Sequence, residues 1–100
     1  MITREQFFKA VEKELDKART KHGTNQWNRH EFHSILEEEF EEVWADIKAN
    51  APTERLLQEV IQMAAVLLHY VETNDRKWGE HPSIGKVLNY GKDHFDPRID

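Results

Sequence analysis

The fold is decided by residues 60 to 71, which read Val60-Ile61-Gln62-Met63-Ala64-Ala65-Val66-Leu67-Leu68-His69-Tyr70-Val71. All but two of these side chains are apolar, and no strand-like alternation interrupts the run. A helix that is apolar on every side has to be surrounded by other elements. We therefore expect this segment to lie at the centre of an all-α fold, covered by the helices that precede it.

Start and stop signals divide the rest of the chain into helices. Capping boxes open two helices upstream, and Gly or an Asn-Ala-Pro sequence closes them. The signals are, in chain order, Thr3 with Gln6, Gly23, Asn28 with Glu31, Asn50-Ala51-Pro52, and Thr53 as the N-cap of the apolar helix. We expect helices at residues 4 to 21, 29 to 49 and 54 to 73, then a short helix at about 83 to 90 and a loose C-terminal tail.

A chain of 100 residues forms a single domain that is too small to cover its own apolar helix. The second helix should contribute an apolar stripe to the core, formed by Phe32, Leu36, Phe40, Val43 and Ile47. Two copies of the resulting helical hairpin would close a four-helix bundle. The sequence therefore predicts a homodimer or homotetramer.

Composition excludes several classes of protein. The chain is 33% charged and 38% apolar, and it has no cysteine, so any metal must be held by carboxylate or imidazole. No apolar run is long enough to cross a bilayer, which predicts a cytoplasmic protein without a membrane partner. Residues 30 to 46 hold seven acids and no Lys or Arg, which argues against a nucleic-acid partner for this segment.

Helical geometry sorts the acids of the second helix. At about 100° per residue, Glu39 and Glu42 lie at the edge of the apolar stripe, whereas Glu38 and Glu41 point to solvent. Asp46 lies on the same flank as Glu42. Of this acidic run, Glu39 and Glu42 are therefore the pair placed next to the core.

The third helix carries an acid inside an apolar stripe. Glu59 shares its face with Leu56, Met63, Val66 and Tyr70. A buried unpaired carboxylate is costly and seldom tolerated. If the hairpin packs with these faces together, Glu39, Glu42, Glu59 and Gln62 converge on one spot.

Such a cluster suits Mg²⁺, a hard cation that takes carboxylate oxygens and also binds phosphates. Like charges three or four residues apart on the second helix are each unfavourable by roughly 0.2 to 0.5 kcal/mol, and a cation would relieve them. The alternative is an ordinary solvated acidic face in which Glu59 pairs with Arg19, Arg29 or Arg55.

The spacing of the acids resembles a known family pattern. Glu39-x-x-Glu42, a gap of sixteen residues and Glu59-x-x-Gln62 are similar to the ExxE, gap, ExxD motif of the all-α nucleoside triphosphate pyrophosphohydrolases. These are the MazG-like proteins, dimeric dUTPases and phosphoribosyl-ATP pyrophosphohydrolases. The likeness covers about residues 10 to 72 and looks closest to the small MazG-like branch, often phage-borne or bacterial.

The resemblance implies hydrolysis of a nucleoside triphosphate to the monophosphate and pyrophosphate, with Mg²⁺ held at the four motif positions. Carried over, Glu39, Glu42 and Glu59 would be catalytic metal ligands. Gln62 stands at the family's Asp, and its amide oxygen can ligate Mg²⁺ without supplying charge. Asp46 would partly compensate. A catalytically silent helical dimer that serves as a nucleotide-binding or regulatory scaffold is the alternative function.

Three residues are candidates for substrate binding: Asp46, on the flank of Glu42, together with Lys21 and Trp27. Lys21 could reach substrate phosphates if the first helix borders the site, or it could compensate the dipole at the end of that helix. Trp27 could stack on a nucleobase, or it could pack in the core.

Overall fold

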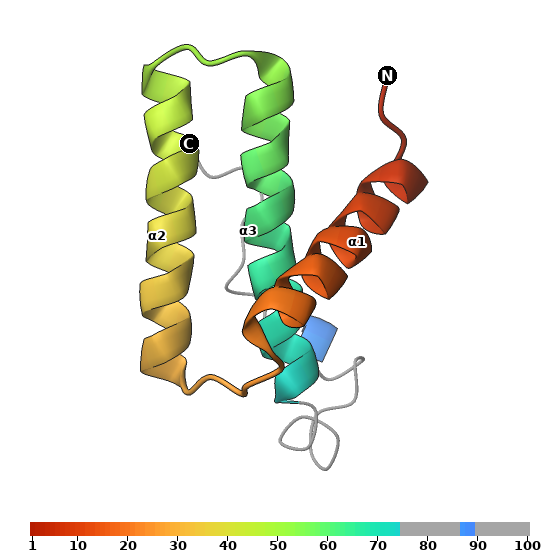
Figure 1. Cartoon of the computed structure of the whole chain (residues 1–100), viewed down its shortest axis with the longest axis vertical. Coiled ribbons are helices and arrows are strands. Elements are labelled where there is room, and N and C mark those ends of the chain that lie inside the picture. Colours follow the sequence, from red (N-terminus) through yellow and green to blue (C-terminus); the bar gives the residue numbers. More distant parts are fainter. Residues whose placement is uncertain (75–86, 90–100) are drawn as a thin grey trace.

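The computed structural model describes residues 1 to 74 and 87 to 89, and apart from the first three residues these are helical or flank a helix end (Figure 1). The three long helices are α1 (Arg4–His22), α2 (Arg29–Lys48) and α3 (Thr53–Thr73). The described part of the chain contains no strand, so the predicted all-α class is confirmed. Residues 87 to 89 are helical, and the rest of the short helix expected at 83 to 90 lies outside the described residues, as does the expected C-terminal tail.

Both predicted capping boxes form. The backbone N–H of Gln6 donates to Thr3 Oγ1 (3.1 Å) while Thr3 N–H donates to Gln6 Oε1 (2.8 Å). Asn28 and Glu31 make the same reciprocal pair, at 2.8 and 3.0 Å. Gly23 ends α1 at φ 86° and ψ −172°, a backbone conformation that only glycine adopts readily. The limits of the 23–28 connection are thus set by local sequence.

The end of α2 is also set locally, by a residue in the left-handed conformation. Asn50 has φ 53°, and its N–H donates to the carbonyl of Ile47 (3.1 Å). The N–H of Ala51 donates to the carbonyl of Asp46 (2.9 Å). This pair of bonds is a Schellman motif, which turns the chain into the short connection to α3.

The start of α3 differs from the prediction that Thr53 caps it. Pro52 occupies the N-cap position, Thr53 is already helical, and no side chain caps the helix. Pro52 has φ −55° and ψ 146°, and its carbonyl accepts the N–H groups of Arg55 and Leu56 (3.0 and 3.1 Å). Because the proline ring fixes φ and its ψ is extended, the backbone supplies the cap conformation one residue earlier than expected.

The helices are arranged around α3 (Figure 1). α2 and α3 form an antiparallel hairpin, and α1 crosses α3 at an angle. α3 packs against both other helices, whereas α1 and α2 do not pack against each other. The buried core lies between α1 and α3 and contains Val11, Leu15 and Ala65. Between α2 and α3, the rings of Phe32 and Tyr70 stack with centroids 3.8 Å apart.

The expected core stripe of α2 is only partly buried. Val43 is buried, but Phe40 and Ile47 are 58% and 51% exposed, and neighbouring Trp44 is 48% exposed. Among the described helices α2 packs only against α3, which covers a narrow seam of its surface. The prediction that Phe40 and Ile47 lie in the core is wrong for the single chain. Within the described residues, no helix is long and apolar enough to cross a bilayer.

Candidate metal centre and adjoining pocket

Three acidic side chains meet where α2 and α3 face each other. Glu39 and Glu42 lie one turn apart on α2, and Glu59 comes from the facing part of α3. One carboxylate oxygen of each lies within 4.8 Å of those of the other two. Glu39 and Glu59 are half-buried and Glu42 is exposed, so the cluster has an open side.

Crowding changes the proton affinity of Glu39. Burial raises the pKa of its carboxyl to about 7, from an ordinary value of 4.5, and the negative charges of Glu42, Glu59 and Glu38 act in the same direction. A side-chain hydrogen bond with Glu42 adds to the effect, as expected when two carboxyl groups share a proton. Near neutral pH, Glu39 is therefore poised between its neutral and charged forms.

The pKa of Glu59 is raised as well. Burial is the main cause, followed by a hydrogen bond with Glu42 and the charges of Glu42 and Asp46, while the Arg55 guanidinium opposes the shift. The ion pair of Arg55 is made with Asp46, whose side chain is 8% exposed, at 3.3 Å between Nε and Oδ1. Of the arginines considered as partners for Glu59, Arg55 thus pairs with Asp46, and Arg19 pairs with Glu72 (3.0 Å).

Several oxygens of this region are buried without a hydrogen-bond partner in the described part of the chain. They are Glu39 Oε2, Glu59 Oε2 and Asp46 Oδ2. A buried acceptor left unsatisfied costs about 1 to 3 kcal/mol, and more if it is charged. A hard cation between the carboxylates would satisfy oxygens of this kind and offset their mutual repulsion, so the donor set fits Mg²⁺ chemically.

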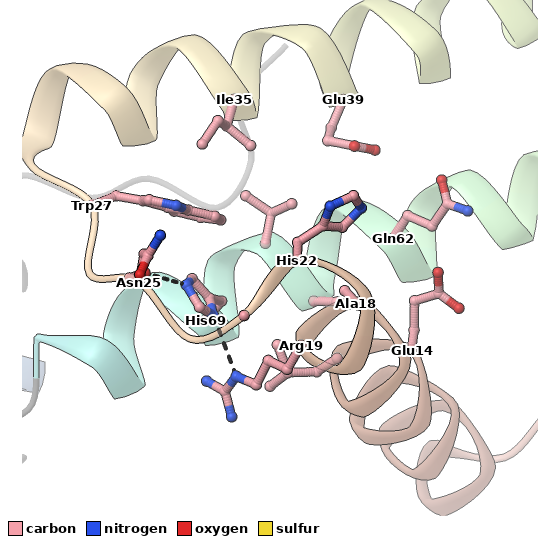
Figure 2. A pocket seen from close by; sticks show the side chains of 14 residues that line it. Glu14, Ala18, Arg19, His22, Asn25, Trp27, Ile35, Glu39, Gln62 and His69 are labelled. Atoms are coloured by element: carbon pink, nitrogen blue, oxygen red, sulfur yellow. Dashed lines mark hydrogen bonds between the residues drawn. The ribbon is translucent and has the colours of Figure 1, made fainter.

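A pocket of about 320 Å³ adjoins the cluster and shares Glu39 with it (Figure 2). It lies between α1, the 23–28 connection, α2 and α3, with an apolar lining interrupted by a few polar groups. The polar and aromatic side chains that line it include Arg19, Asn25, Trp27, Glu39, Gln62 and His69. This volume lies at the lower end of the range of small-molecule sites.

The predicted site residues fall into two groups. Gln62 and Trp27 line the pocket, and Gln62 comes from α3 opposite the helix that carries Glu39 (Figure 2). Lys21 is exposed and is not part of the pocket lining. Asp46 is buried and lies near Glu59 without lining the pocket.

The sequence analysis missed His69, which lines the pocket next to the 23–28 connection. His69 is 5% exposed and contacts Asn25, Arg19 and Trp27. One signal was available, because His69 is one of only two polar residues in the apolar run 60 to 71. Its partners were not predictable, since they lie 44 and 50 residues away in the chain.

Comparison with known proteins gives no match, whether with protein-family models, curated proteins or solved structures.

Proposed function

We propose that this protein is a Mg²⁺-dependent nucleoside triphosphate pyrophosphohydrolase, which converts an NTP or dNTP and water to the monophosphate and pyrophosphate. The observation that carries the proposal is the convergence of Glu39, Glu42 and Glu59 with oxygens within 4.8 Å. The resemblance of their spacing to the MazG-like motif supports the reaction class, and Gln62 on the same helix as Glu59 completes that motif.

The acidic residues would hold the metal. Glu39, Glu42 and Glu59 offer carboxylate oxygens, and Gln62 would add an amide oxygen at the boundary with the pocket. Mg²⁺ bound there would neutralise phosphate charge and lower the pKa of an attacking water. The buried oxygens of Glu39 and Glu59 would gain the partner that they lack among the described residues.

The pocket would hold the nucleoside. Its apolar lining and the half-buried Trp27 indole suit a flat heteroaromatic ring, and the amide groups of Asn25 and Gln62 can donate to or accept from the edge of a base. A ligand placed there directs its phosphates toward Glu39, the residue common to pocket and cluster. Lys21 is exposed, so it would contact phosphate only at the outer surface.

The exposed apolar face of α2 would bind a second copy of the chain. Phe40, Trp44 and Ile47 follow at helical spacing and are each about half exposed. Such a patch is unusual on a monomer surface, and a two-fold axis would let it pair with itself. Two α2–α3 hairpins joined in this way form a four-helix bundle, as a dimer or as the building unit of a tetramer.

One residue favours the second candidate function, a catalytically silent nucleotide-binding or regulatory scaffold. Gln62 brings no negative charge, so the site has three carboxylates where the resembling motif has four. Such a site would hold Mg²⁺ less tightly, and the pocket would still bind a nucleotide.

Pyrophosphate release tests the proposal. The protein is incubated with Mg²⁺ and a panel of common and modified ribonucleoside and deoxyribonucleoside triphosphates. We expect hydrolysis of at least one, and loss of at least about a hundredfold in kcat for Glu39→Gln and Glu59→Gln. Glu41→Gln, the same change at an exposed position of α2, is the matched control and should retain activity. No hydrolysis of any nucleotide would reject the enzyme.

Gln62→Asp separates the two candidate functions. Restoring the fourth carboxylate should tighten Mg²⁺ binding by about tenfold in calorimetry, because it adds a charge next to the cation. If the wild type binds nucleotides without hydrolysing them and Gln62→Asp gains hydrolysis, the scaffold reading is correct. Unchanged Mg²⁺ affinity would show that Gln62 does not face the metal.

A further inference from the structure

A buried histidine joins α3 to the connection between α1 and α2. His69 Nε2 lies 2.8 Å from the carbonyl oxygen of Asn25, and its Nδ1 lies 3.3 Å from Arg19 Nε. A carbonyl oxygen can only accept, and a guanidinium can only donate. The imidazole is therefore neutral, with its proton on Nε2, and both of its nitrogens are used (Figure 2).

The two partners of His69 are themselves held in place. Arg19 pairs with Glu72, which lies one turn beyond His69 on α3. A second tie joins the connection to the end of α3, because Gln26 Nε2 donates to Asn74 Oδ1 (2.8 Å) and Asn74 is almost fully buried. The 23–28 connection is thus fixed to α3 and its C-cap through polar contacts at Asn25 and Gln26.

The same imidazole ring supports the pocket wall. The rings of Trp27 and His69 lie with centroids 4.2 Å apart and planes tilted by 48°. Trp27 lies two residues after Asn25, and both line the pocket. The ring contact and the hydrogen bond to Asn25 act on the same short segment, so together they restrict where the indole can lie.

We infer that His69 is a positioning residue, which holds the 23–28 connection so that Trp27 forms the pocket wall and thereby sets the affinity for the pocket ligand. The inference rests on the proposed function for the nature of that ligand, a nucleoside triphosphate. His69 acts through Asn25 and Trp27 and takes no part in the chemistry at the carboxylates. Its loss should weaken ligand binding and leave the turnover of bound ligand nearly unchanged.

The first test needs no enzyme activity. His69→Phe keeps a ring next to Trp27 and removes both hydrogen bonds, whereas His69→Gln keeps a donor for the Asn25 carbonyl. We expect backbone amides of the 23–28 connection to exchange about tenfold faster in His69→Phe, and less so in His69→Gln. Nitrogen-15 NMR of the wild-type imidazole should show the proton on Nε2. Val11→Ala truncates a core residue that does not itself line the pocket, and it controls for general loss of stability.

The second test uses the nucleotide that the wild-type protein hydrolyses fastest. In His69→Phe, KM should rise about tenfold while kcat stays within about twofold, and His69→Gln should recover part of the loss. The Val11→Ala control should change neither constant beyond about twofold.

The outcomes distinguish this inference from the proposed function. If no nucleotide is hydrolysed, but the exchange and the imidazole tautomer follow the expectation, the positioning role stands and the enzyme function fails. If His69→Phe remains folded with unchanged exchange in the 23–28 connection, the positioning role is overturned. The positioning role is also overturned if nucleotides are hydrolysed and the KM of His69→Phe equals that of the wild type.

Discussion

Glu39 is the residue at which the acidic cluster and the pocket meet. Its carboxyl is half-buried, has Glu42 and Glu59 as neighbours, and has a pKa raised to about 7. Such a group is stable as a neutral acid or as a cation ligand, and it is unfavourable as a free carboxylate. Its ionisation should therefore be visible in the stability of the metal-free protein.

Metal-free protein should lose stability as the pH rises from about 4.5 to about 7. Below pH 4.5 Glu39 is protonated in both the folded and the unfolded chain. Between about pH 4.5 and 7 the unfolded chain releases this proton while the folded chain keeps it, so rising pH lowers the free energy of unfolding. Glu39→Gln imitates the protonated form and should raise Tm at pH 8 by roughly 5 °C, with almost no difference at pH 4.5. Calorimetry in chelator measures this, with exposed Glu41→Gln as the control. Parallel Tm curves for wild type and Glu39→Gln would contradict it.

The convergence of the acidic side chains could largely be predicted from the helical period of about 3.6 residues. Glu39, Glu42 and Glu59 were expected to converge, because a helix fixes which side chains share a face and a short turn fixes the antiparallel pairing. The surroundings of His69 and Asp46 could not be predicted. They depend on how α1 and Arg55 lie against α3, and the periodicity of the chain does not encode that arrangement.

At the scale of elements, the helix ends lie where the sequence predicts them wherever a capping side chain or a glycine determines the end. Thr3 and Asn28 formed their capping boxes, and Gly23 ended α1. The start of α3 was mispredicted because Pro52 fixes the backbone without any side-chain hydrogen bond. Substitution of Asn50, which ends α2 at a positive φ, tests whether the local backbone conformation sets the end of a helix.

Asn50→Ala should destabilise the protein by about 1 kcal/mol, because alanine is strained in the left-handed conformation. Asn50→Gly should stay within about 0.5 kcal/mol of the wild type, since glycine is the usual residue at this position of a Schellman motif. Urea unfolding of both variants gives the comparison. Glycine normally destabilises a chain relative to alanine, so a more stable alanine variant would show that Asn50 does not adopt this conformation.

At the scale of the whole molecule, the chain leaves much of α2 uncovered. Of the helices that the structure describes, only α3 packs against it, and the apolar residues Phe40, Trp44 and Ile47 remain exposed in the single chain. The sequence indicated that Phe40 and Ile47 should be buried, because their spacing fits a core stripe. Periodicity identifies an apolar face, but it does not say whether the same chain or another one covers it.

Light scattering at micromolar concentration should give the mass of a dimer or tetramer for the wild type. Trp44→Glu should halve that mass or reduce it to the monomer, because a charge then enters the proposed interface. The chain itself should still fold, since Trp44 is half exposed in the monomer and contacts Lys48. Phe8→Glu, at an exposed apolar position on α1, should leave the mass unchanged. A monomeric wild type would reject the proposed bundle.

The lack of packing between α1 and α2 has a mechanical consequence for the pocket they enclose. In the part of the chain that the structure describes, its two walls are joined only through α3 and the 23–28 connection, so the pocket is a gap in the packing between the helices. A ligand that fills the gap supplies the missing packing between the walls. A bound ligand should then slow backbone amide exchange along the whole of α1, including turns far from the ligand. The exchange rate of α1 would therefore report how much of the protein has ligand bound.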